Sequence, residues 1–182
     1  NGLFGRRIKS EKVIALIACA TILTSFVLSV GAVYELAQRP VEERHEEITL
    51  YEWIPSGVAH LTDDAAHDKT ATFSVPFAFL LDPLSAVMIL VVTGVGSLIH
   101  IYAVGYMRGD AGYYRFFTYL NLFVFFMLIL VLGNSYGLMF IGWEGVGLCS
   151  YLLIGYYIGK RSAGDAGKKA FIVNRIGDLG FI

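Results

Sequence analysis

Hydrophobic residues gather into long unbroken runs that are separated by polar segments. Four runs, at 13–36, 84–107, 116–133 and 135–157, are long enough to cross a bilayer, since about 20 helical residues at ~1.5 Å each span its ~30 Å core. A fifth run, 170–182, reaches only ~20 Å before the sequence stops, so it is predicted to be truncated. The pattern predicts an all-α fold, a polytopic transmembrane helix bundle with four full spans and a truncated fifth.

The segment between the first two spans, 37–78, is predicted to be an acidic external loop. It carries eight acidic and three basic residues and is interrupted by prolines. A metal site formed by His45, His60 and His67 with nearby aspartates is an alternative, but their spacing matches no ligand motif. A solvated acidic loop is the favoured interpretation.

Composition supports a membrane protein. The chain is 56% hydrophobic and 16% charged, and its mean hydropathy is +0.63, which is far above that of ordinary soluble domains. Cys19 and Cys149 both lie inside apolar runs, so they predict no disulfide framework, and two thiolates are too few for a four-cysteine iron–sulfur cluster. Cys19 also resembles a lipoprotein acylation site, but apolarity continues beyond it, which favours an uncleaved span. No redox centre and no nucleic-acid partner are expected for this chain.

Positive charge is unevenly distributed between the two sides of the predicted bundle. The less basic side has three cations, Arg39, Arg44 and Lys69. The other side has ten, namely Arg6, Arg7, Lys9, Lys12, Arg108, Arg115, Lys160, Arg161, Lys168 and Lys169. The positive-inside rule therefore predicts a cytoplasmic N-terminus and cytoplasmic loops at 108–115 and 158–169. These basic loops are candidates for contact with anionic lipids.

Glu144 lies near the middle of the fourth span, which is otherwise uncharged. A charged group at that depth costs about 2.5 to 3.5 kcal/mol on insertion scales, so it is rarely kept without a partner, a water-filled cavity or a function. A protonated, hydrogen-bonded packing residue is the alternative. Gly142, Gly145 and Cys149 form a small-residue face on the same helix, which predicts close contact with a neighbouring helix.

The fifth run contains a second polar group. Asn174 and Arg175 precede Asp178 by one helical turn and share its face. Helical rise places Asp178 and Glu144 at similar depth, so both carboxyl groups are candidate proton relays, with Arg175 and Asn174 in support. A permanent structural ion pair between Arg175 and Asp178 remains open. His100 is either an interfacial histidine or the mouth of a proton entry path.

Three motifs, in this order, carry a resemblance to a known family: DPLSAVMILVVTGVGSLIHIYAVGYMRGDAGYYRFFTYLNLF, GWEGVGLCSYLLIGYY and KKAFIVNRIGDLGF. They cover somewhat over half of the chain, which resembles the N-terminal part of the largest antiporter-like membrane subunit of respiratory complex I. This subunit is called L in bacterial NADH:quinone oxidoreductase and 5 in mitochondrial NADH dehydrogenase. The resemblance implies that Glu144 is the family's membrane-buried glutamate, that its partner is a lysine on a later helix beyond this sequence, and that Asp178 and Arg175 form a neighbouring polar cluster.

The function implied by the resemblance is proton translocation driven by electron transfer from NADH to quinone. NADH, FMN, iron–sulfur clusters and quinone would be bound by partner subunits of the membrane arm and its attached redox domain, and the location would be the bacterial inner membrane. Two other kinds of transporter remain open: the large subunit of a multisubunit Na⁺/H⁺ antiporter and the membrane arm of a proton-pumping hydrogenase. A structural membrane scaffold without transport is the non-transport alternative.

Overall fold

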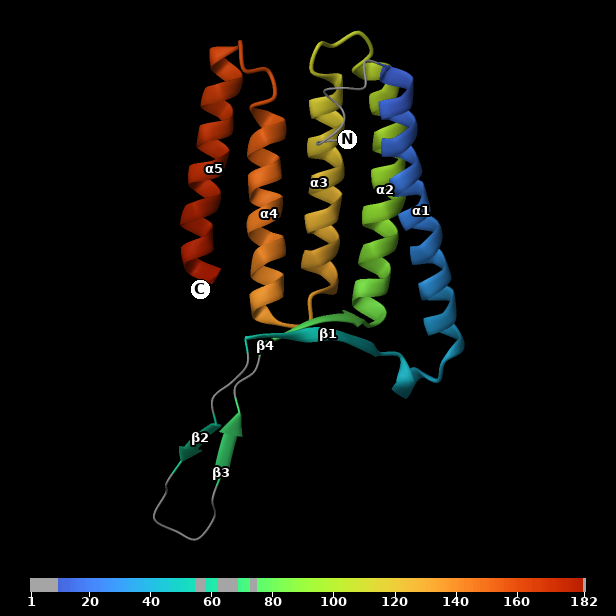
Figure 1. The fold of residues 1–182 in the computed structure, drawn as a ribbon, viewed down its shortest axis with the longest axis vertical. Coiled ribbons are helices and arrows are strands. Elements are labelled where there is room, and N and C mark those ends of the chain that lie inside the picture. The colour runs from blue at the N-terminus through green and yellow to red at the C-terminus, as the bar shows by residue number, and fades with distance from the viewer. Residues whose placement is uncertain (1–9, 55–57, 62–68, 73–74, 182) are drawn as a thin grey trace.

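Five helices run antiparallel to their neighbours in the sequence and form the body of the protein (Figure 1). The computed structural model describes residues 10–54, 58–61, 69–72 and 75–181. The helices are α1 (Glu11–Gln38), α2 (Pro83–Tyr106), α3 (Tyr113–Leu132), α4 (Tyr136–Ile154) and α5 (Arg161–Phe181). Each helix packs on the next, and α1 also contacts α3. The predicted helical bundle is confirmed.

Helices α1 to α4 are long and apolar enough to cross a membrane. Their outer faces leave large apolar side chains uncovered: Leu16 is 70% exposed, Val27 67% and Leu98 68%. Apolar surface of this extent is rare on a soluble monomer, whereas lipid tails accept it. The chain is therefore an integral membrane protein.

The helix starts follow from local capping. The Asp82 side chain accepts a hydrogen bond from the Ser85 backbone N–H at 2.7 Å, and the Ser85 hydroxyl accepts one from the Asp82 N–H at 2.8 Å. Pro83 follows at the first helical position, where a missing N–H costs nothing. Ser135 caps α4 in a similar way, because its hydroxyl accepts a bond from the Leu138 N–H. These caps fix where α2 and α4 begin.

The bounds of the observed helices differ from those of the predicted apolar runs mainly at α5. Helix α5 begins at Arg161, well before the apolar run at 170. Residues 161–170 contain several alanines and no proline, so they continue as helix although they are too polar to enter lipid. Helix α4 ends at Ile154, where the Gly155 N–H bonds to the Tyr151 carbonyl at 2.9 Å. Helix α1 is continuous through Cys19, as expected for a span.

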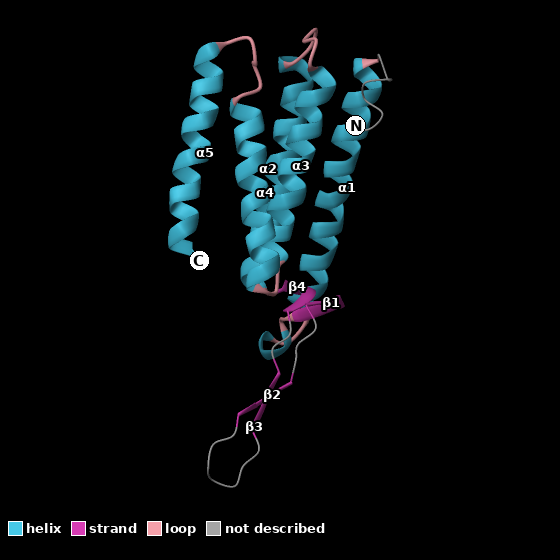
Figure 2. Ribbon diagram, turned by 60° about the vertical axis from the view of Figure 1, so that its left-hand side comes forward, coloured by secondary structure: helices cyan, strands magenta, loops and turns pink. Residues whose placement is uncertain are grey.

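The segment predicted to be a loop contains regular structure. A short helix, η1 (Val41–Glu43), leads into β1 (Glu46–Ile54), which pairs antiparallel with β4 (Val75–Leu81). A second antiparallel pair, β2 (Val58–Leu61) and β3 (Lys69–Thr72), extends away from the bundle (Figure 2). These strands were not predicted for 37–78, which was expected to be an acidic external loop, because net charge and prolines were weighed above the β-forming residues of EEITLYEWI and VPFAFLL. Of the metal alternative, His67 and the aspartates 63, 64 and 68 lie outside the described residues.

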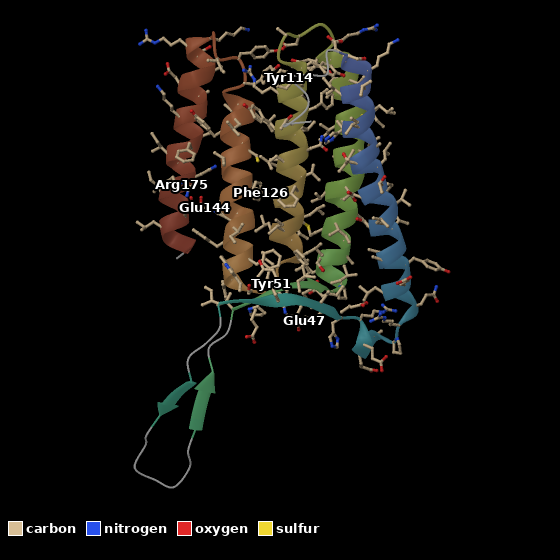
Figure 3. The ribbon with its side chains drawn as sticks, viewed as in Figure 1. Glu47, Tyr51, Tyr114, Phe126, Glu144 and Arg175 are labelled. Atoms are coloured by element: carbon tan, nitrogen blue, oxygen red, sulfur yellow. The ribbon has the colours of Figure 1, made fainter. Side chains whose placement is uncertain are left out.

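The β1–β4 sheet closes one end of the bundle, and Figure 3 places Glu47 and Tyr51 on the strand that crosses this end. The Asn134 N–H donates to the Ala78 carbonyl at 3.0 Å, and the Ser135 hydroxyl donates to the Pro76 carbonyl at 3.1 Å. Tyr51 also stacks on Phe77, with ring centroids 5.1 Å apart. The turn between α3 and α4 is thereby held against the sheet.

The opposite end of the bundle carries most of the basic residues, and we call it the basic end. It contains the start of α1, the α2–α3 connection and the α4–α5 connection (Figure 1). The buried Tyr156 joins two of these segments: its hydroxyl donates to Asp110 at 2.6 Å, and its carbonyl accepts from Arg115 at 3.2 Å. The backbone N–H of Gly112 also donates to Asp110, at 2.7 Å. These bonds tie the α2–α3 connection to the end of α4.

Tyr156→Phe should lower stability by about 1 kcal/mol near pH 7, because it removes a hydrogen bond to a partly exposed carboxylate. The Tyr156 hydroxyl, then the Gly112 N–H and Arg115, lower the pKa of Asp110. The Asp110 carboxylate therefore contributes its whole stabilisation of the fold above the pKa of an unfolded Asp, about 3.9. This stabilisation is lost as the pH falls below that value. Burial, and then Asp110, raise the pKa of Tyr156, so its contribution is full below about pH 10 and is lost at higher pH.

Thermal unfolding measured across pH would test this link. The Phe variant should lose less stability than the wild type at both pH extremes. Tyr157→Phe, a change of the exposed neighbouring tyrosine, is the matched control and should follow the wild type. Parallel pH profiles for wild type and Tyr156→Phe would contradict the proposed bond.

Candidate functional site

Helix α4 is placed by close contact with α3. A Cβ atom on Gly142 would lie 2.5 Å from the backbone N of Leu130, and one on Gly145 would overlap the ring of Phe126. Only glycine allows the two helices to approach this closely. This contact fixes the rotation of α4 about its axis, so Glu144 is directed toward α5 rather than toward α3.

Glu144 forms an ion pair with Arg175 of α5 (Figure 3). Arg175 also lies 3.6 Å from the Asp178 carboxylate, one turn further along α5. The Glu144 side chain is 21% exposed and that of Asp178 is 9% exposed. Two carboxylates thus share one guanidinium at the same level of the bundle.

Glu144 has a partner within this chain, because Arg175 pairs with it in the structure. The lysine implied by the resemblance would lie on a later helix beyond this sequence and stays a prediction. The pair of Arg175 and Asp178 is part of the same cluster. Arg175 is further held over the ring of Phe171, 4.8 Å from its centroid, which is the distance of a cation–π contact.

Trp143 completes the cluster, and sequence reasoning missed it. Its indole N–H donates to Asp178 at 2.6 Å. The indole nitrogen is a donor only, so it orients one oxygen of the Asp178 carboxylate. The sequence did contain a clue to this contact: Trp143 is next to Glu144 in an apolar run, and a buried tryptophan N–H usually finds a hydrogen-bond partner.

A cavity of about 350 Å³ lies between α4 and α5 beside the cluster. Its polar wall contains Glu144, Asn174, Arg175 and Asp178, and its apolar wall includes Met127 of α3. A water molecule takes up about 30 Å³ of liquid volume, and a polar cavity of this size accommodates several. Asn174 lines the cavity, where its amide can bond to water or to the neighbouring carboxylates.

His100 is fully buried between helices, and its two interpretations, an interfacial histidine and the mouth of a proton entry path, both stay predictions. Its Nδ1 lies 2.7 Å from the Gly96 carbonyl, and because a carbonyl only accepts, Nδ1 carries the proton. Its Nε2 has no hydrogen-bond partner within the described part of the chain. The nearby Asn121 side chain of α3 interacts with the ring and accepts a bond from Thr21 of α1 at 3.1 Å.

The structure does not bring His100 into the Glu144 cluster, because α3 separates α2 from α4. His100 lines an apolar cavity of about 210 Å³ between α2 and α3. Met127 lines this cavity as well as the one beside Glu144. A single flexible side chain of α3 thus borders both spaces.

Comparison with known proteins connects this site to a family. The family described as "NADH-Ubiquinone oxidoreductase (complex I), chain 5 N-terminus" matches residues 69–117, and the family described as "NADH:quinone oxidoreductase/Mrp antiporter, TM" matches residues 133–182. The NADH-quinone oxidoreductase subunit L of Pseudomonas aeruginosa is 43% identical over 176 residues, which are 97% of this chain and 26% of the relative. This chain belongs to the antiporter-like membrane subunits of complex I.

Other members of the subunit L and chain 5 family show the same relationship. The NADH-ubiquinone oxidoreductase chain 5 of Allomyces macrogynus is 39% identical over 183 residues, covering 100% of the chain and 26% of the relative. Subunit L of Escherichia coli is 57% identical over 107 residues, 59% of the chain and 18% of the relative. The chain thus spans about a quarter of the length of these subunits. Glu144, Arg175 and Asp178 lie in the residues matched by the antiporter family, and His100 lies in those matched by the chain 5 family.

Proposed function

We propose that this chain is the part of a proton-translocating membrane-arm subunit of NADH:quinone oxidoreductase that contains one of its proton relays. The observation that carries the proposal is the sharing of Arg175 by Glu144 and Asp178. Two carboxylates, of which Asp178 is buried and Glu144 is half-buried, cannot both be fully neutralised by one cation. One of them is therefore poised to accept a proton when the guanidinium moves toward the other.

The cavity beside the cluster supplies the proton route. When Arg175 moves toward Asp178, Glu144 loses its counter-charge in a low-dielectric environment and takes a proton from water in the cavity. When Arg175 returns, Glu144 releases it. Arg175 itself stays charged and moves no proton. Trp143 holds Asp178 in place through its hydrogen bond, so the proposed step changes mainly the contact between Arg175 and Glu144.

His100 serves as the entry side of this route in our proposal. Its Nε2 is an unused acceptor within the described residues and can receive a proton. Met127 separates its cavity from that of Glu144, and the three rotatable bonds of a methionine allow it to swing aside. A rotamer change of Met127 would then connect the two spaces.

The energy for this movement would come from electron transfer in partner subunits, which would bind NADH, FMN, iron–sulfur clusters and quinone. The enzyme is the assembled NADH:quinone oxidoreductase, and this chain contributes ion translocation to it. We propose that the protein lies in a bacterial inner membrane. Its N-terminus and basic end would face the cytoplasm, because cytoplasmic loops carry an excess of Lys and Arg.

Ion transport without redox partners is the second candidate, favoured by the second matching family, whose description includes the Mrp antiporter. Copurification of the full-length protein distinguishes the two. Recovery with flavin and iron–sulfur subunits supports the proposal, whereas recovery with small antiporter subunits alone overturns it. A purely structural role predicts that changes in the Glu144 cluster leave proton pumping unchanged.

Trp143→Phe should lower NADH-driven proton pumping about tenfold, because loss of a hydrogen bond to a charged group weakens the placement of Asp178 by roughly 1.5 kcal/mol. Proton uptake by inverted membrane vesicles, normalised to the amount of assembled complex, measures this. Trp53→Phe makes the same chemical change in β1 and should pump at the wild-type rate. Equal pumping by both variants would remove Trp143 from the relay.

A further inference from the structure

A second cavity, of about 200 Å³, lies at the basic end where α3, α4 and α5 meet. Arg115, Tyr119 and Tyr151 line it, and Gly164 of α5 forms part of its wall. A Cβ atom on Gly164 would meet nothing within 4 Å, so this wall borders open space. The cavity is remote from the Glu144 cluster and is not used by the proposed relay.

Arg115 has unused capacity to donate hydrogen bonds in this cavity. Its Nη2 donates to the Tyr156 carbonyl at 3.2 Å, and its guanidinium lies over the Tyr156 ring. Its Nε–H is buried and has no partner among the described residues. The neighbouring carboxylate of Asp110 is already bonded to Tyr156 and to the Gly112 N–H. A buried donor without a partner is costly, and an anion is the natural partner for a guanidinium.

Two more cations flank the cavity. Arg161 and Lys168 lie three residues before and four residues after Gly164, so they share its face of α5. That face is turned toward α4, because Phe171 of the same face contacts the Tyr151 ring at 5.6 Å. Both cations are solvent-exposed, and neither forms an ion pair within the described ranges. Asp165 lies between these two cations on α5, and Asp110 lies beside Arg115, so the three cations exceed the neighbouring carboxylates by one charge.

We propose that this cavity binds the phosphate of an anionic phospholipid. Tyrosines such as Tyr119 and Tyr151 are typical of the membrane interface, where lipid phosphates lie, and Figure 3 places Tyr114 at this same end of α3. Ile158 lines the cavity and is 75% exposed, which offers apolar surface for the lipid chains. Basic pockets between transmembrane helices are suited to such headgroups. Arg115 binds the phosphate directly, and Arg161 and Lys168 attract it.

Native mass spectrometry of the full-length protein in its complex tests the site, with added phosphatidylglycerol, phosphatidylcholine or inorganic phosphate as probes. Phosphatidylglycerol should bind the wild type in preference to phosphatidylcholine. Arg161→Gln and Lys168→Gln should each weaken binding about fivefold, the effect expected for one charge at a membrane surface. Arg108→Gln removes an exposed charge from the same end outside the cavity and should change nothing.

Two further variants test the cavity itself. Arg115→Gln should abolish binding; should that variant not assemble, Gly164→Leu fills the cavity while keeping all three cations and should also expel the lipid. Equal binding of the two lipids, or retention in Gly164→Leu, would overturn the site. Inorganic phosphate that binds as tightly as the lipid would show a soluble anion as the ligand and would overturn the lipid assignment.

Discussion

Replacing Glu144 with Gln should lower NADH-driven proton pumping about tenfold or more while leaving the complex assembled. Gln matches the size of Glu but carries no charge, so Arg175 would keep only Asp178 as a partner. A charge-assisted hydrogen bond contributes about 1.5 to 3 kcal/mol, which corresponds to roughly 10- to 100-fold in an equilibrium. Proton uptake by inverted vesicles, measured against NADH oxidation in the same vesicles, gives the effect on coupling.

The control for this change is Glu47→Gln, which removes the same charge from the exposed strand β1. It should pump at the wild-type rate. Wild-type pumping by Glu144→Gln would rule out the relay role. Failure of that variant to assemble, with normal assembly of the control, would instead favour a packing role for Glu144.

Gly142→Ala should destabilise the protein by about 2 kcal/mol or more, because overpacking of a well-packed contact typically costs 1–3 kcal/mol. The added Cβ would lie 2.5 Å from the Leu130 nitrogen and 2.6 Å from its Cα. These are backbone atoms inside a helix and cannot move aside as a side chain would. Helices α3 and α4 must therefore separate, and pumping should fall as Glu144 is displaced from Arg175.

Gly147→Ala is the matched control on the same helix, since a Cβ there would meet nothing within 4 Å. It should be neutral or stabilising by up to about 1 kcal/mol, because Ala forms helix better than Gly. Thermal unfolding of the purified complex, followed by the loss of this subunit, compares the two variants. Equal midpoints would show that α3 and α4 are not in close contact at Gly142.

The main features of the bundle could be predicted from the chain alone. Apolar runs located helices α1 to α4, because a segment that crosses lipid must be apolar and helical over its whole length. Helical rise also placed Glu144 and Asp178 at similar depth, and both contact Arg175 in the structure. The strands β1 and β4 escaped prediction, since pairing between segments so far apart depends on register and not on local composition.

The candidate residues and one contact among them could be predicted from the sequence. Glu144 and Asp178 were identified by their cost in lipid, which depends only on residue type and depth, and Arg175 and Asp178 share a helix face. The ion pair between Arg175 and Glu144, and the bond from Trp143 to Asp178, depend on which way each helix faces. His100 shows the same limit, because its complete burial results from contact among α1, α2 and α3.

The sequence by itself determined which segments enter the membrane, which side carries the positive charge and how deep each ionisable group lies. These properties follow from transfer energies and from the fixed rise of a helix, so they need no knowledge of neighbours. Only the tertiary structure decided which side chains meet. The rotation of α4 about its axis depends on the contact of Gly142 and Gly145 with α3, and that rotation directs Glu144 toward Arg175.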